Sequence, residues 1–153
     1  MASIVRWVFA ILITFALGGG AAPGMNPVVA SAREASNATA LVIENTRSVA
    51  LVLYRADQER VLARAKAENW TIEKAQQQLK TVRAWWDRVE NALTLAEQAH
   101  AALRQAVIVA IETENVGRQP DVATLLRLSS ELAAAQQQVA ILLAEARKHD
   151  TDG

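Results

Sequence analysis

Glu97 and His100 are the candidate metal ligands of this chain. They form an E-x-x-H pattern, which places both side chains on one face of a helix. In di-iron carboxylate bundles, two such motifs and two further glutamates surround the metals. This chain has one E-x-x-H, so a metal or haem site would need a dimer, with Glu131 or Glu59 supplying further ligands. A lone E-x-x-H is a weak motif. We favour a structural interpretation, in which His100 is partly buried and forms a hydrogen bond with Glu97, three residues earlier on the same helix.

The remaining side chains offer little for catalysis. The chain has no cysteine, one tyrosine and two histidines, which excludes disulfides, thiolate metal sites and a cysteine nucleophile. No G-x-S-x-G, P-loop or H-E-x-x-H motif is present. His149 falls in the last predicted helical turn, where a cation complements the helix dipole. We therefore expect a protein that is not an enzyme and holds no cofactor.

The charge balance argues against nucleic acid as a partner. Lys and Arg number 16, and Asp and Glu also number 16, so the formal net charge is zero. A neutral chain without a basic block has no electrostatic attraction for phosphate backbones. The sequence also lacks the polybasic run that would hold it to an anionic membrane surface.

Three long helices are expected to carry these residues. After residue 28 the only helix breakers are Gly117 and Pro120, in a chain rich in Ala, Leu, Gln, Glu and Arg. Breaks at 68–71 and 115–121 divide the body into helices at about 33–67, 72–115 and 120–148. Gly117 suits a left-handed C-cap, and Pro120 suits the first turn of the next helix. Short connections predict that neighbouring helices run antiparallel.

The second predicted helix carries the clearest hydrophobic pattern. Its seam, a row of residues spaced alternately by three and four, comprises Ile72, Ala75, Leu79, Val82, Trp86, Val89, Leu93, Ala96, His100, Leu103, Val107 and Ala110. The seam predicted for the third helix comprises Val122, Leu125, Ser129, Leu132, Gln136, Val139, Leu143 and Ala146, widened on one side by Leu126, Ala133 and Ala140. These seams predict an all-α fold, an elongated antiparallel three-helix bundle with coiled-coil-like heptad packing.

The first predicted helix is less regular, and it motivates the expected partner surface. Residues 41–43 and 49–54 are apolar all round, so they must be covered on more than one side. The second helix also outruns the third by roughly 16 residues, or about 24 Å. Both features predict association with a second copy or with another helix. The predicted interface residues are Leu41, Val42, Val49, Val52, Leu53, Tyr54 and Trp85.

The N-terminal segment, residues 1–32, resembles a secretory signal in its layout. Arg6 precedes an uninterrupted apolar run at 7–17, small residues and breakers follow, and no further charge occurs before Arg33. Ala30 and Ala32 form an A-x-A cleavage pattern that would release a helical body of residues 33–153.

The alternative is an uncleaved membrane anchor at residues 7–22. This segment is slightly shorter than the ~20 residues of a comfortable helical span. A capping box from Ser31 to Glu34 would start the first helix at Ser31, and cleavage after Ala32 would destroy it. Under either interpretation the body lies outside the cytoplasm, provided that Arg6 sets the usual orientation.

These observations together predict an exported helical subunit, periplasmic or in the cell envelope. It would bind protein partners, as a homo-oligomer or within a larger envelope complex, through long helix faces. One alternative is a dimeric bundle that binds metal or haem through Glu97 and His100. The other is a membrane-tethered spacer or accessory subunit of a membrane complex.

Overall fold

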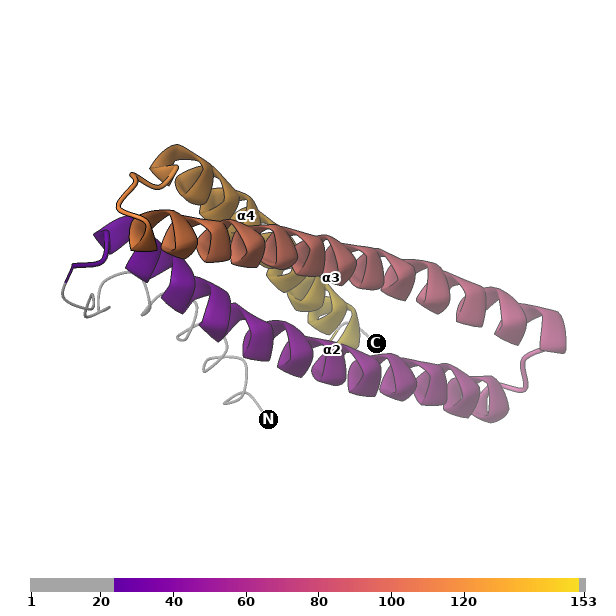
Figure 1. The fold of residues 1–153 in the computed structure, drawn as a ribbon. Coiled ribbons are helices and arrows are strands. Elements are labelled where there is room, and N and C mark those ends of the chain that lie inside the picture. The colour runs from indigo at the N-terminus through magenta and orange to yellow at the C-terminus, as the bar shows by residue number, and fades with distance from the viewer. Residues whose placement is uncertain (1–23, 152–153) are drawn as a thin grey trace. The chain divides into compact units, whose positions relative to one another are not determined.

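The computed structural model describes residues 24–151, with side chains described for residues 24–145. Over this range the chain is all-helical, with no strand, and its three helices pack against each other (Figure 1). The helices are α2 at Pro27–Ala67, α3 at Ile72–Asn115 and α4 at Val122–Thr151. The all-α prediction is confirmed. The predicted signal or anchor at residues 7–22 lies outside the described residues.

No helix within residues 24–151 combines the length and the apolarity needed to span a membrane.

Helix α2 begins at Pro27, earlier than the predicted start near residue 33. Its N-cap is Asn26, whose Oδ1 accepts a hydrogen bond from the Val28 N–H at 2.9 Å. Pro27 occupies the first helical position, where the missing N–H costs nothing. The Asn26 N–H in turn donates to Glu114 Oε1 at 2.9 Å, which ties the start of α2 to the end of α3. The helix therefore starts at an Asn-Pro cap and not at Ser31.

Both helix-ending turns use a residue in the left-handed backbone region. Asn69 has φ 50° and Gly117 has φ 72°. After α2, the Trp70 N–H donates to the Ala65 carbonyl at 2.9 Å; after α3, the Arg118 N–H donates to the Thr113 carbonyl at 3.0 Å. These are Schellman bonds, which satisfy carbonyls that the helix end leaves free.

The helices that follow these turns start at side-chain caps. Thr71 Oγ1 accepts from the Lys74 N–H at 3.3 Å, and Asp121 Oδ1 accepts from the Thr124 N–H at 3.0 Å. Asp121 is thus the N-cap of α4. Pro120 precedes this cap, so its predicted place in the first helical turn is wrong.

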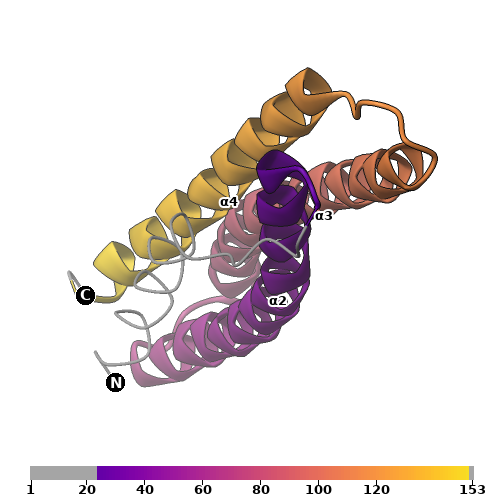
Figure 2. The same ribbon diagram turned by 60° about the vertical axis from the view of Figure 1, so that its left-hand side comes forward.

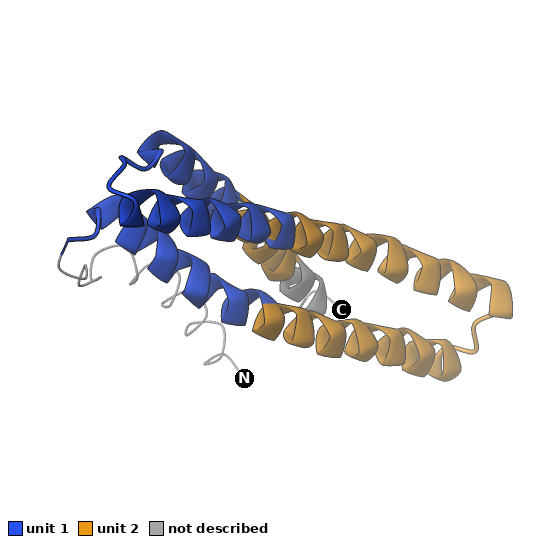
Figure 3. Ribbon diagram, viewed as in Figure 1, with its two compact units in different colours: residues 1–43, 97–134 blue, residues 44–96, 135–153 orange. Residues whose placement is uncertain are grey.

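The described chain divides into two compact units (Figure 3). Unit 1 contains residues 24–43 and 97–134, and unit 2 contains residues 44–96 and 135–151. Each helix passes through both units without a break (Figures 1 and 2). The core of unit 1 consists of Val29, Ala32, Leu103, Val107, Ala110, Leu125, Leu128 and Leu132.

Buried positions on α3 follow the seam expected from the sequence. The seam residues that are buried are Trp86, Val89, Leu93, Ala96, Leu103, Val107 and Ala110. Burial fades toward the start of the helix, where Ile72 is 73% exposed. The three-four spacing of apolar residues therefore identifies the inward face of this helix over most of its length.

On α4, three of the seven expected seam positions whose side chains are described are buried. The buried residues are Leu125, Leu128, Leu132, Val139 and Leu142. Ser129, Gln136 and Leu143 are half-buried, and Leu126, which was expected to widen the inward stripe, is 57% exposed. Leu128 and Leu142 are buried in place of the residues at 129 and 143, and each points about 100° away from the residue that was expected there. The stripe widens on the side opposite to the predicted one.

A row of buried residues also runs along α2. The sequence alone does not reveal this row because two of its members are polar. The buried residues Val29, Ala32, Ser36, Thr39, Ile43 and Ala50 recur at heptad positions. Ser36 and Thr39 are buried because each makes a polar contact within the protein. No buried side-chain N or O atom among the described residues lacks a hydrogen-bond partner.

Candidate functional site

The His100 ring is bound to the backbone and side chain of a residue on α2, within unit 1. Its Nε2 lies 2.8 Å from the Ser36 carbonyl oxygen and 3.2 Å from Ser36 Oγ. The shorter contact requires a proton on Nε2, since a carbonyl oxygen can only accept. Ser36 is buried and His100 is half-buried. The ring therefore connects α3 to α2 through a polar contact at the seam.

The single described chain does not bring all of the predicted metal ligands together, and the site predicted for a dimer stays a prediction. Glu131 is exposed and pairs with Arg127, whose Nη1 lies 2.6 Å from Glu131 Oε1. Among residues 24–145, no group of three or more His, Cys, Asp or Glu side chains lies close enough to hold a metal ion. A metal at Nε2 of His100 would also displace the contact with Ser36. Glu59, the other predicted ligand, is an exposed residue of unit 2.

A second polar contact at a buried position occurs in unit 2, around Trp86. The Trp86 indole Nε1 donates to Asp57 Oδ2 at 2.8 Å, and Arg60 lies 3.3 Å from the other carboxylate oxygen. The rings of Tyr54 and Trp85 pack against the Trp86 ring, with centroids 5.9 and 4.7 Å away. A buried indole N–H needs an acceptor, and Asp57 supplies it from α2.

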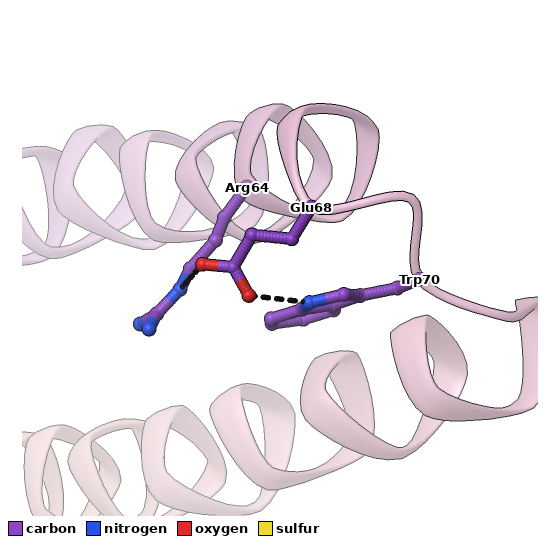
Figure 4. Close-up of polar contacts among 3 residues, drawn as sticks. All are labelled: Arg64, Glu68 and Trp70. Atoms are coloured by element: carbon purple, nitrogen blue, oxygen red, sulfur yellow. Dashed lines mark hydrogen bonds and ion pairs between the residues drawn. The ribbon is translucent and has the colours of Figure 1, made fainter.

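The turn between α2 and α3 carries a compact group of exposed charges around Trp70 (Figure 4). Glu68 accepts hydrogen bonds from Arg64 Nε and from Trp70 Nε1, each at 2.7 Å. Lys74 Nζ lies 4.2 Å from the centroid of the Trp70 ring, within cation–π range. The Arg64 hydrogen bond, followed by that from Trp70, lowers the pKa of Glu68 below its ordinary value. At this turn, the charged side chains and Trp70 therefore interact with one another.

The residues of the predicted cleavage pattern lie inside α2 in the structure. Ala30 and Ala32 are both helical and buried. Val29, between the N-cap and this pattern, is 0% exposed and belongs to the core of unit 1. Cleavage after Ala32 stays a prediction, and it would remove two members of that core together with the cap.

The predicted interface residues divide into exposed and half-buried groups. On α2, Leu41 is 64% exposed, Val49 is 37% and Val52 is 66%. Val42, Leu53, Tyr54 and Trp85 are half-buried. Within the apolar segment 49–54, Ala50 supplies the buried position while Leu51 and Val52 face solvent. The all-round apolar segment is thus covered on one side only within the described chain.

The sequence did not reveal which polar residues form hydrogen bonds between the helices. Ser36, Asp57 and Glu114 are polar residues to which no motif draws attention, and each is bonded to a residue distant in sequence. One signal was present: all three lie three or four residues from apolar positions of their own helix. Polar members of a seam can be recognised only when the apolar neighbours are read with them.

No protein-family model, curated protein or solved structure matches this chain. A functional assignment therefore rests on its own residues and their contacts.

Proposed function

We propose that this protein is an exported, non-catalytic helical subunit that binds a protein partner through the outer face of α2. The observation that carries the proposal is the exposure of Leu51 and Val52, at 52% and 66%, in the middle of an apolar segment. Fully burying one such side chain contributes roughly 1.5–3 kcal/mol. Leu62, further along the same helix, is also exposed.

The proposed architecture for this role is an antiparallel bundle with coiled-coil-like heptad packing. The support is the three-four spacing of buried residues on α2, α3 and α4. Helices that are already folded and packed can present a face to a partner without the cost of ordering it on binding. A helix face laid against another helix is a common mode of recognition.

A site-specific photo-crosslinker tests the proposed binding face in the cell that makes the protein. Placed at Val52, it should give a discrete crosslinked product, because this side chain would be buried against the partner. The matched control is Gln77, an exposed polar position on α3, which should give none. The absence of a product at Val52, or equal products at both positions, would contradict the proposed face.

The proposal of export depends on the N-terminal sequence, and a mass measurement on cell fractions tests it. A soluble extracytoplasmic chain that has lost its N-terminal segment would support a cleaved signal. A full-length chain recovered only in detergent would support the tethered alternative, with residues 7–22 as anchor. A full-length chain in the soluble cytoplasmic fraction would contradict both.

A further inference from the structure

A second row of residues at heptad spacing runs along α2 within unit 2, on the side away from the buried seam. We call it the outer seam; all of its members are exposed, and they are Ser48, Val52, Arg55, Glu59, Leu62 and Lys66. Spacings of four, three, four, three and four keep these side chains on one face of the helix. Leu51 and Ala63 lie beside this row and are exposed as well. The face spans about 28 Å at 1.5 Å per residue.

The order of residues along the outer seam is complementary to its own reverse. Val52 and Leu62 lie five residues before and after Asp57, and Arg55 and Glu59 lie two residues before and after it. When two identical helices pack antiparallel, residues at equal distances from the centre face each other. Val52 then meets Leu62 of the second copy, and Arg55 meets Glu59 of the second copy. Two-fold symmetry makes each contact twice.

The charges favour this direction over the opposite one. In a parallel pair with the same register, Arg55 would face Arg55 of the second copy and Glu59 would face Glu59. Like charges at facing positions repel, whereas the antiparallel pair places two attractive contacts at its centre. The apolar contacts on either side supply the burial, and the charges set direction and register.

The helix is already formed and packed on its other side, which removes a large cost of association. A coiled coil of this length built from free peptides would first have to nucleate its helices. Here the buried seam of α2 already packs within the protein. Ala50 is buried, and the Asp57 carboxylate accepts a hydrogen bond from Trp86 of α3. Dimerisation then has to order only exposed side chains.

We propose that the outer seam of α2 packs antiparallel against the outer seam of a second copy, with Val52 against Leu62 and Arg55 against Glu59. The proposal deepens the proposed function and depends on it in one respect: it names the partner of the same face as a second copy of this chain.

Charge reversal with mixing tests both the partner and the register. Exposed ion pairs contribute little individually, so replacing two attractive contacts by two repulsive ones should weaken self-association by about tenfold. Arg55→Glu alone and Glu59→Arg alone should each show this loss in sedimentation equilibrium. An equimolar mixture of the two variants should regain association as a heterodimer, because every facing pair is then opposite in charge. The double variant R55E/E59R should regain it on its own.

Two controls make the outcome specific. Arg88→Glu makes the same change at an exposed position of α3 in unit 2 and should leave association unchanged. Circular dichroism should show that each variant keeps the wild-type helix content, because Arg55 and Glu59 are exposed. All measurements use the protein purified as the cell produces it.

The proposal is overturned by a wild-type protein that stays monomeric at its highest soluble concentration. It is also overturned if Arg55→Glu associates like the wild type, or if the mixture of variants fails to regain association. A monomeric protein whose Val52 crosslinks to a different chain would leave the proposed function standing and remove only the second copy as its partner. A monomeric protein without any crosslink at Val52 would remove both.

Discussion

At the residue scale, His100 joins two helices through a hydrogen bond. Its Nε2 donates to the carbonyl of the buried Ser36, and Ser36 Oγ lies close to the same atom. An E-x-x-H motif places a histidine on a helix face, but the facing helix determines which atom meets the ring. Here that atom is a backbone oxygen of α2, which accepts a hydrogen bond from the ring.

The substitution His100→Ala should therefore lower stability without changing metal content. Removing a donor from a buried contact costs about 1–3 kcal/mol, and we expect a loss in this range from urea denaturation. Gln105→Ala, at an exposed position of the same helix, is the control and should change stability little. Bound metal in the wild type that disappears in the His100 variant would contradict the structural role.

The contact between Trp86 and Asp57 is the corresponding polar link in unit 2. Asp57→Ala leaves a buried indole N–H without its acceptor, which should destabilise the protein by about 1–3 kcal/mol. Asp87→Ala, an exposed aspartate on α3, serves as the control. In a double-mutant cycle with Trp86→Phe, the two losses should be less than additive, because each variant removes the same bond. Strict additivity would mean that the bond contributes nothing.

At the scale of elements, the start of α2 is the feature that the structure places differently. Sequence patterns predict a start near residue 33, whereas an Asn-Pro cap starts the helix at Pro27. The six residues that precede Arg33 in the helix include Val29 and Ala32, which belong to the core of unit 1. These two residues pack with residues of α3 and α4, and they also belong to the predicted signal segment.

A chain that begins at Arg33 should consequently be less stable than one that begins at Gly24. It loses a fully buried valine, worth roughly 1.5–3 kcal/mol, and the Asn26 cap, worth about 1 kcal/mol. Thermal unfolding followed by circular dichroism compares the two chains directly. Equal unfolding temperatures would show that residues 24–32 add no stability, and that release of the chain at Arg33 leaves the fold intact.

Helix α4 shows why periodicity alone leaves the phase of a helix open. Leu125, Leu132 and Val139 belong both to the predicted seam and to the buried set. Between these residues, the next buried position can lie either three or four residues further along the helix. Both positions can be apolar, as Leu142 and Leu143 are after Val139. The direction from which the neighbouring helices approach decides between them, and that direction is a tertiary property.

At the scale of the whole molecule, the described chain leaves one long face of α2 exposed in unit 2. The outer seam combines three kinds of residue in a palindromic order: polar at its ends, apolar next, and opposite charges at its centre. An interaction subunit needs a face that is stable when free and specific when bound. Charged residues within the face serve the first requirement by keeping it soluble, and their order serves the second.

The helical class and the limits of the central helix follow from the amino-acid sequence alone. Ala- and Leu-rich segments favour helix residue by residue, and Asn69, Thr71 and Gly117 interrupt it through local backbone preferences. The inward face of α3 follows from the sequence as well, because a row at heptad spacing that is apolar except at His100 has one way to be buried. These signals are local, so a single chain displays them without reference to its fold.

The polar residues that lie between the helices depend instead on tertiary contacts. The buried Ser36 meets His100, the half-buried Asp57 accepts from the Trp86 indole, and Asn26 meets Glu114 across 88 residues of sequence. The start of α2, where Asn26 meets Glu114, and the face that α4 buries likewise depend on tertiary packing. Each depends on the partner that a side chain meets in space, and the free-energy cost of burying a polar group depends on that partner.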